Sequence, residues 1–271
     1  MSLQSLYKQA RLEIVWPFWF NQGMAEETWL EGIISIEAAL TSGSRDVLGI
    51  YVHMTPKRER NRRLARLRQT AVSANIPVQL VDEEFIAARV SGKSHGGVIA
   101  SVGPRRFVSL EELLGEGARP FLVMLDGVED PFNFGQAVRS LYAAGVDGLV
   151  LRPRNWLTAA GVVARASAGA SELMPLAVAE TAEDAALFYK RHNLTIACTS
   201  DKQAQSIYET DLNIPLFLLV GGEKRGITRS FLNQADLKLR IPYGRAAYRQ
   251  SLGVAASAAI LGFEIMRQRG D

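Results

Sequence analysis

The feature that most constrains the fold is a series of short, uninterrupted apolar runs in the second half of the chain. Residues 121–125 read FLVML, and residues 215–220 read PLFLLV. Runs of this kind, without polar alternation, are typical of parallel strands that are covered by helices on both faces. Similar patterns predict further strands at 148–151, 194–199 and 237–241, with helices between them. The sequence therefore predicts an α/β fold with a parallel sheet in its C-terminal part.

A second, smaller α/β unit is predicted upstream of this sheet. Helices expected at 25–42, 57–74 and 82–90 alternate with strands expected at 48–54, 77–81 and 96–102. Gly, Pro and charged residues then gather before residue 121, so a linker is expected at 115–119. The expected division is an N-terminal extension at 1–24, a small α/β domain at 25–115 and a larger domain at 119–271. The extension contains WPFWF at 16–20, which suits packing or an interface.

Composition limits the class of protein. The 271 residues are 48% hydrophobic and 22% charged, which indicates a folded globular chain long enough for two domains. Cys198 is the single cysteine, so an intramolecular disulfide is excluded and a reducing, cytoplasmic location is expected. The sequence has no apolar stretch of about 18 residues, so no membrane span is expected. Charged residues interrupt the N-terminal segment where a secretory signal would need an apolar core.

Charge is concentrated in one segment, although the net charge is only +3. Residues 57–68 read KRERNRRLARLR and contain seven basic residues and one acidic residue. Leu64 and Leu67 are spaced as the apolar stripe of a helix. Two interpretations remain open, a solvated helix face and a surface that follows phosphates. The candidate RNA-binding side chains are Lys57, Arg58, Arg62, Arg63 and Arg66.

Two segments of the second half carry residues suited to ligand binding. Asn133 is expected near a helix start, and Arg139 follows within two turns with a planar group suited to phosphate. From spacing alone, an N-cap and a surface arginine are the plainer interpretation. Gly221 and Gly222 follow the strand expected at 215–220, where glycine lets a ligand approach the backbone.

Several common sites are missing from the sequence. It contains no G-x-x-x-x-G-K-[ST] phosphate loop, no G-x-S-x-G nucleophile motif and no Cys/His set with metal-ligand spacing. No metal is therefore expected. The three histidines, His53, His95 and His192, are isolated in sequence and are expected to be structural.

Three segments, taken together, resemble the motifs of the TrmH/SpoU family of SPOUT RNA methyltransferases. They are DPFNFGQAVRSLYAAG at 130–145, LLVGGEKRGI at 218–227 and IPYGRAAYRQSLGVAASAAI at 241–260. Each alone is weak, but their order and their positions relative to the strands agree with the family. In the first half, LEGIISIEAALTSG and IPVQLVDEEFIAARVSGKSHGGVIASV resemble the small RNA-substrate-binding domain often fused to these enzymes.

The resemblance implies a fold, an activity and partners. The C-terminal domain would be a SPOUT domain with a deep trefoil knot, and the protein would be a homodimer. It would transfer a methyl group from S-adenosylmethionine to a ribose 2′-hydroxyl of rRNA or tRNA. The basic run at 57–68 would then have RNA as its partner. A base methyltransferase of the same superfamily is an alternative that Asn133 and Arg139 disfavour.

The resemblance also assigns residues by motif match. The cofactor pocket would contain Gly221, Ile241 and Leu252, with Thr199 and Gly222 nearby. The catalytic and RNA-facing set would be Asn133, Arg139, Glu223 and Ser251. A guanidinium hardly deprotonates in proteins, so Arg139 is expected to clamp the target phosphate or stabilise the developing alkoxide.

One position departs from the family. Its members read Ser-Leu-Asn-Val in the third motif, and this chain has Gly253 in place of the asparagine. The loop before it is also longer by about two residues than the resemblance predicts. Tyr248 or Gln250 would supply the lost contact, or the target would differ, or catalysis would be weak. A noncatalytic homologue that binds S-adenosylmethionine and RNA is therefore an alternative to an active enzyme. A nucleotide-dependent α/β enzyme of another type is a third hypothesis, which the missing phosphate loops disfavour.

Overall fold

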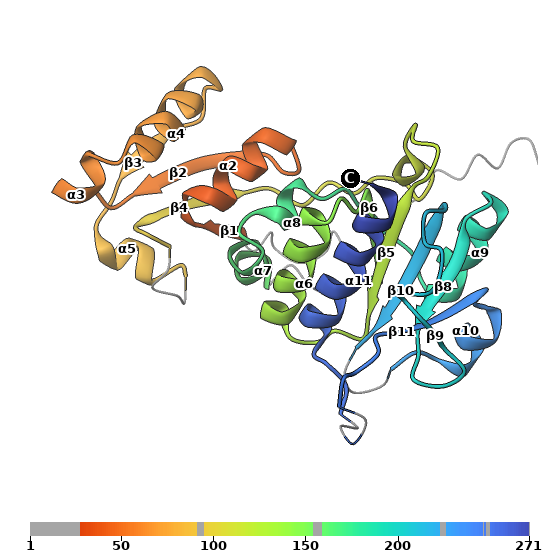
Figure 1. Ribbon diagram of the computed structural model, residues 1–271. Helices are drawn as coiled ribbons and strands as arrows, with labels where there is room; N and C mark the ends of the chain where they lie inside the picture. The colour runs from red at the N-terminus through yellow and green to blue at the C-terminus, as the bar shows by residue number, and fades with distance from the viewer. Residues whose placement is uncertain are drawn as a thin grey trace, which may run out of the picture.

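The computed structural model describes residues 28–90, 95–153, 159–222, 226–245, 247 and 250–270. These residues form a small N-terminal unit with a four-stranded sheet and a C-terminal unit with a seven-stranded sheet (Figure 1). The predicted α/β class with a parallel C-terminal sheet is confirmed. The expected N-terminal extension at 1–24, Glu223 and Tyr248 lie outside the described residues.

The first sheet has the strand order β1-β4-β2-β3. Its strands are β1 (Thr28–Glu31), β2 (Val47–Val52), β3 (Val78–Leu80) and β4 (Val98–Val102). The helices of this unit are α2 (Gly32–Ser42), α3 (Pro56–Glu59), α4 (Arg62–Ser73) and α5 (Glu83–Ala87). Leu64 and Leu67 of α4 are buried in one cluster with Ile36 of α2 and Ile50 of β2. The apolar stripe predicted for residues 57–68 therefore holds α4 against the sheet.

Two predictions for the first unit are wrong. Residues 28–31 are not helical, because they form β1 and pair antiparallel with β4. Gly32, at φ +81°, makes the turn from this strand into α2. The helix expected at 57–74 is two helices, because Asn61 caps α4 by accepting the N–H groups of Arg63 and Leu64 at 2.9 and 3.2 Å. Asparagine favours such a cap over a helix interior.

The second sheet has the order β7-β6-β5-β10-β8-β11-β9, and all of its pairings are parallel. Its strands are β5 (Phe121–Asp126), β6 (Gly148–Leu151), β7 (Leu176–Val178), β8 (Thr195–Thr199), β9 (Gln205–Ser206), β10 (Leu216–Gly221) and β11 (Leu237–Arg240). The five strands predicted from apolar runs are confirmed. The sequence does not predict β7 and β9, which are only three and two residues long.

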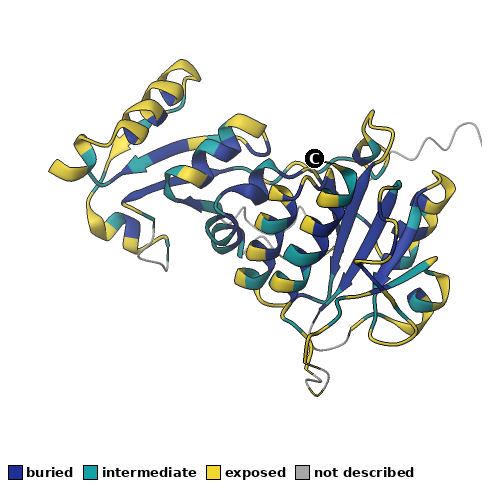
Figure 2. Cartoon of the chain, in the orientation of Figure 1, coloured by how far each residue is buried: buried dark blue, intermediate teal, exposed yellow. Residues whose placement is uncertain are grey.

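Helices cover both faces of this sheet, and its central strands are buried (Figure 2). Phe121, Val123 and Leu125 of β5 point into one apolar cluster, and Leu122 and Met124 point into the other. A strand buried on both sides needs apolar residues at every position, which explains the continuous runs. The helical elements are η2 (Glu112–Leu114), α6 (Pro131–Ala143), α7 (Ala160–Ala166), α8 (Ala170–Leu173), α9 (Ala182–Arg191), α10 (Arg229–Gln234) and α11 (Val254–Arg269).

None of the helices within the described residues is both long enough and apolar enough to cross a membrane.

Candidate functional site

The carboxyl ends of β5 and β10 meet where the order of strands reverses. The strands that follow β5 in the chain, β6 and β7, lie on one side of it in the sheet. The later strands β10 and β8 lie on its other side. The N–H of Gly222 donates to the carbonyl oxygen of Asp126 at 2.6 Å. A side chain at Gly222 would overlap the carbonyl of Gly127, so glycine lets the two strand ends touch. Open α/β sheets bind their ligands in the crevice at such a reversal.

The residues that the resemblance assigns to the cofactor lie at this edge of the sheet. Thr199 ends β8 and Gly221 ends β10, and the Gly221 N–H lies 3.5 Å from the hydroxyl oxygen of Thr199. Ile241 follows β11, whose Leu239 pairs with Thr199. Strand order therefore brings together side chains and backbone groups that are up to 42 positions apart in the numbering, from 199 to 241.

A pocket of about 380 Å³ opens beside these strand ends. Ile241 and Leu252, both predicted cofactor residues, line it. The remaining lining residues are Tyr208, Pro242, Tyr243, Gly244, Arg245 and Ile260. The other predicted cofactor residues, Thr199, Gly221 and Gly222, are not part of this lining. Among the described residues, the lining of this open pocket is thus mostly apolar, and Arg245 is the charged residue in it.

The segment between β11 and α11 returns on itself at this pocket. The backbone N–H of Leu252 donates to the hydroxyl oxygen of Tyr243 at 3.1 Å, which ties the two ends of the segment together. Ser251 is exposed next to Leu252. Gly253 is the N-cap of α11, with φ −59° and ψ 151°, and as a glycine it offers no side chain to cap this helix. These angles are open to any residue, so the backbone does not require glycine here.

Asn133 and Arg139 both lie on α6, but they do not share one face of the helix. Asn133 is not the N-cap, because Asp130 holds that position and its Oδ1 accepts the Asn133 N–H at 2.7 Å. Six residues at about 100° each place Arg139 well around the helix from Asn133. Arg139 is exposed. The structure therefore leaves this guanidinium on the surface, where an RNA phosphate can reach it.

Further ionisable groups near the sheet have plain structural roles. Arg152, at the end of β6, forms an ion pair with Asp126 at 3.2 Å, a contact that the sequence does not predict. Burial raises the pKa of the Cys198 thiol to about 11, so it stays protonated at neutral pH. Within the described ranges, no cluster of three or more His, Cys, Asp or Glu residues could hold a metal ion.

In the basic run at 57–68, some side chains contact other groups of the protein and others are exposed to solvent. Arg58 donates to the carbonyl oxygen of His53 at 2.8 Å, and Arg63 pairs with Glu37 at 2.5 Å. Arg62 and Arg66 are exposed and lie one turn apart on the side of α4 opposite its buried stripe. Lys57 is exposed on α3. Of the five predicted RNA-binding residues, Lys57, Arg62 and Arg66 are therefore the best placed for phosphates.

Sequence reasoning missed two aromatic residues of the pocket. Tyr243 lies inside the third motif, and its signal was an aromatic side chain directly after the strand-ending Ile241-Pro242. Tyr208 has no sequence signal of this kind, because it reaches the pocket only through the pairing of β9 with β11.

Comparison with protein families gives two matches that together cover most of the chain. The model of the SpoU rRNA Methylase family matches residues 120–263. The model described as RNA 2′-O ribose methyltransferase substrate binding matches residues 29–108. The resemblance found in the sequence motifs is confirmed by both.

Individual relatives agree over nearly the whole chain. The 23S rRNA (guanosine-2′-O-)-methyltransferase RlmB of Haemophilus influenzae is 28% identical, over 91% of this chain and 99% of its own. The protein of the same name from Photorhabdus laumondii is 30% identical, over 89% of this chain and 98% of its own. Among solved structures, the SpoU methyltransferase AviRb from Streptomyces viridochromogenes in complex with the cofactor AdoMet is similar in fold. Its TM-score is 0.72 at 19% identity, with 89% of this chain and 90% of that chain covered.

Proposed function

Because the chain belongs to the SpoU rRNA methylase family, we propose that it methylates a ribose 2′-hydroxyl of ribosomal RNA with S-adenosylmethionine as donor. The observation that carries the proposal is that β10 and β11, which lead into the family's second and third motifs, flank β8 in one parallel sheet, so both motifs leave the same edge of the sheet, where the third motif lines a pocket. The relatives named as 23S rRNA guanosine methyltransferases favour a guanosine of 23S rRNA as the target.

The pocket fits the proposed donor in its chemistry. Ile241, Leu252 and Tyr243 offer apolar and aromatic surface, which suits a purine ring. Arg245 at the same pocket suits a carboxylate. When bound, S-adenosylmethionine supplies an electrophilic methyl group on a sulfonium.

The residues of this chain must then orient the ribose hydroxyl and receive its proton. Methyl transfer is an in-line displacement, so positioning contributes a large part of the acceleration. We assign Arg139 to the target phosphate or to the developing alkoxide, because its exposed guanidinium carries a permanent charge. Asn133 and Glu223 hold neighbouring groups in this proposal, and Ser251 lies on the RNA-facing side.

The N-terminal unit would bind the RNA away from the reacting nucleotide. Arg62 and Arg66 face solvent one turn apart, a spacing that lets both contact phosphates. We propose domain limits of 25–115 and 119–271, and the matched ranges 29–108 and 120–263 support them.

The assembly and the location of the protein are part of the same proposal. A homodimer is supported by exposed aromatic side chains on the adjoining helices α6 and α11, namely Phe132, Tyr142 and Phe263. The trefoil knot is inferred from family membership. A cytoplasmic location is supported by the proposed RNA substrate and by the unpaired Cys198, which suits a reducing compartment.

A noncatalytic homologue remains the second candidate, and Gly253 is the observation that favours it. The third motif lacks the amide that the family has at this position, and no side chain of the described residues caps α11 there. Such a protein would bind S-adenosylmethionine and RNA without methyl transfer.

One experiment separates the two candidates. The protein is incubated with S-adenosylmethionine labelled on its methyl group and with bulk rRNA or tRNA, and 2′-O-methyl positions are then mapped. Label in a single rRNA ribose supports the proposed enzyme. Calorimetric binding of S-adenosylmethionine with no label in either RNA supports the noncatalytic homologue. Label on a base contradicts ribose methylation.

A further inference from the structure

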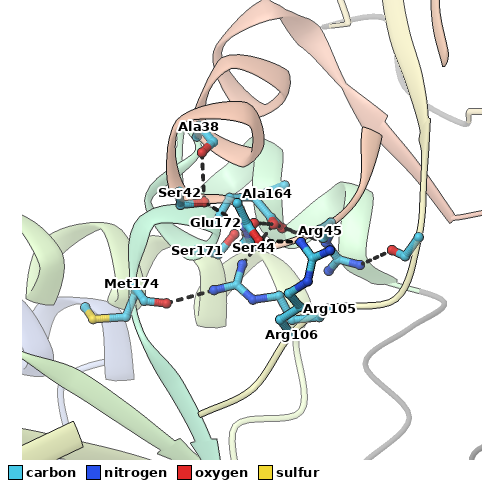
Figure 3. A network of polar contacts seen from close by, with 12 residues as sticks. Ala38, Ser42, Ser44, Arg45, Arg105, Arg106, Ala164, Ser171, Glu172 and Met174 are labelled. Carbon is cyan, nitrogen blue, oxygen red and sulfur yellow. Dashed lines mark hydrogen bonds and ion pairs between the residues drawn. The ribbon is translucent and has the colours of Figure 1, made fainter. Parts of the chain in front are cut away.

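A buried cluster of charges joins the two units of the chain (Figure 3). The carboxylate of Glu172, in α8, accepts from Arg45 Nε at 3.1 Å and from Arg105 Nη1 at 2.8 Å. The Ser44 hydroxyl donates to the same carboxylate at 2.6 Å. Ser44 and Arg45 follow α2 in the first unit, and Arg105 lies just after β4. One carboxylate of the second unit therefore binds two side chains of the first unit, Ser44 and Arg45, and one side chain of the segment that follows it, Arg105.

This cluster is shielded from water. The side chains of Arg45, Arg105 and Glu172 are 6%, 6% and 3% exposed. Arg105 also donates through Nη2 to the carbonyl oxygen of Met174 at 2.8 Å. A buried charge that loses its partner is strongly unfavourable, because water cannot replace the lost contact. Separation of the two units would break the cluster, so the cluster opposes their separation.

Close apolar contacts reinforce the same joint. Ala164 of α7 is fully buried inside the apolar cluster of the first unit. Side chains at Gly161 and Gly169 would collide with Trp29 and Ala38, so glycine lets α7 and α8 lie against β1 and α2. A second ion pair joins Arg165 of α7 to Glu31 of β1. The first unit is thus docked on α7 and α8, and it is not merely tethered by the segment before residue 121.

The docking fixes the span between two distant surfaces. Figure 1 shows α4 at the upper left and the described residues between β11 and α11 towards the bottom, on different units of the molecule. An RNA that contacts both must bridge this span. If the units cannot rotate, the span is constant, and only nucleotides at a suitable distance from the α4 contact reach the pocket.

We propose that Glu172 is a positioning residue that clamps the two units into one body and so sets which nucleotide of a folded RNA reaches the methyl-transfer site. The inference rests on the proposed function for its RNA readout, but the clamp itself is a property of the protein alone. RNA held at α4 gains affinity only when the target lies at the clamped distance. A short RNA that contacts only the pocket gains nothing from the clamp.

The test measures the clamp and its effect on substrates separately. Nitroxide labels are attached at Val72→Cys in α4 and Leu187→Cys in α9, two exposed positions at opposite ends of the protein. Cys198 is buried and does not compete for label. Double electron–electron resonance gives the distance distribution for the wild-type background, Glu172→Gln and Arg45→Met. Arg106→Met is the matched control, because Arg106 forms an exposed ion pair with Asp46 at the same joint.

The substrate arm compares a long rRNA fragment with the shortest fragment that the wild type still methylates. We expect one narrow distance for the wild type and Arg106→Met, a broad distribution for Glu172→Gln and an intermediate one for Arg45→Met. For Glu172→Gln, kcat/KM on the long RNA should fall at least tenfold, mainly through KM. Activity on the short RNA and affinity for S-adenosylmethionine should stay within twofold of the wild type.

Three results would overturn the inference. They are a broad distance distribution in the wild type, an unchanged distribution in Glu172→Gln, and equal losses on long and short RNA. If Glu172→Gln does not fold, Arg45→Met decides, because it keeps the Arg105 to Glu172 pair and lowers the risk of unfolding. If the wild type methylates no RNA, the proposed function is wrong, while the distance measurement still decides whether the clamp exists.

Discussion

Restoring asparagine at position 253 should stabilise the protein and accelerate methyl transfer, and the structure separates the two effects. Gly253 is the N-cap of α11, and its φ of −59° and ψ of 151° suit asparagine without strain. The first N–H groups of a helix lack partners within the helix, and Gly253 has no side chain that could accept a hydrogen bond from them. An asparagine side chain at this position would accept one of them.

The size of the stabilisation follows from two contributions. Asparagine in place of glycine at an N-cap gains a few tenths of a kcal/mol. Removing glycine also lowers the entropy of the unfolded chain, which contributes about 0.4–1 kcal/mol. The sum is about 1 kcal/mol, which raises the melting temperature of a protein of this size by about 2–4 °C. One added hydrogen bond from the amide to the reacting groups is worth about 1 kcal/mol, or about fivefold in kcat.

Matched substitutions at the same position distinguish capping from chemistry. Gly253→Asp has the shape of asparagine and caps a helix equally well, but its ionised carboxylate cannot donate a hydrogen bond. Calorimetry should show both variants melting above the wild type, whereas single-turnover methylation should accelerate only in Gly253→Asn. A melting temperature that does not rise in either variant refutes the capping argument. Equal rates in the two variants refute the role of the amide.

Three further variants test other parts of the molecule. Arg139→Ala should nearly abolish methyl transfer and leave the calorimetric affinity for S-adenosylmethionine close to normal; a collapse of that affinity would contradict its assignment to the RNA. The double variant Arg62→Glu, Arg66→Glu should weaken RNA binding and lower the slope of log K against log salt by about 2, whereas Arg191→Glu on α9 should leave it unchanged. Glu172→Gln should lose about 3–5 kcal/mol of stability at pH 7, because Arg45 and Arg105 lose their buried partner.

The pH dependence of that last loss has a definite sign. Burial alone raises the pKa of Glu172, but Arg45, Arg105 and the hydrogen bond from Ser44 outweigh it, so the pKa lies below its ordinary value of 4.5. The unfolded chain therefore takes up the proton at a higher pH than the folded protein. The stabilisation is present above pH 4.5 and is lost as the pH falls through the folded pKa. Denaturant titrations should show the gap between wild type and Glu172→Gln narrowing below pH 4.5.

The success and failure of sequence reasoning have physical causes in particular residues. Strands β5 and β10 are buried on both faces, so their continuous apolar runs predict them from local sequence alone. The sequence predicts a helix at residues 28–31, and this prediction is wrong because their strand conformation depends on pairing with β4, about 70 residues away. Short β7 and β9 owe their conformation to adjacent strands in the same way.

Some residues of the candidate site can likewise be assigned from the sequence, whereas others join it only through the fold. Ile241 and Leu252 belong to one motif, so the sequence could assign both to one pocket by resemblance, and the structure places both in its lining. Tyr208 joins them only because β9 pairs with β11. Arg58 and Arg63 belong to the basic run by sequence, yet their contacts with His53 and Glu37 engage them within the protein.

By itself, the sequence determined the α/β class, the five long strands of the second sheet and the motifs of the methyltransferase family, because these depend on local composition and spacing. Only the tertiary structure decided which residues share the pocket, which arginines face solvent and how the two units are joined. Glu172 shows the reason most clearly. Its partners Arg45 and Arg105 lie 127 and 67 residues before it, so the sequence does not pair them with it. Its role arises because the fold buries its carboxylate between these two arginines, where water cannot take their place.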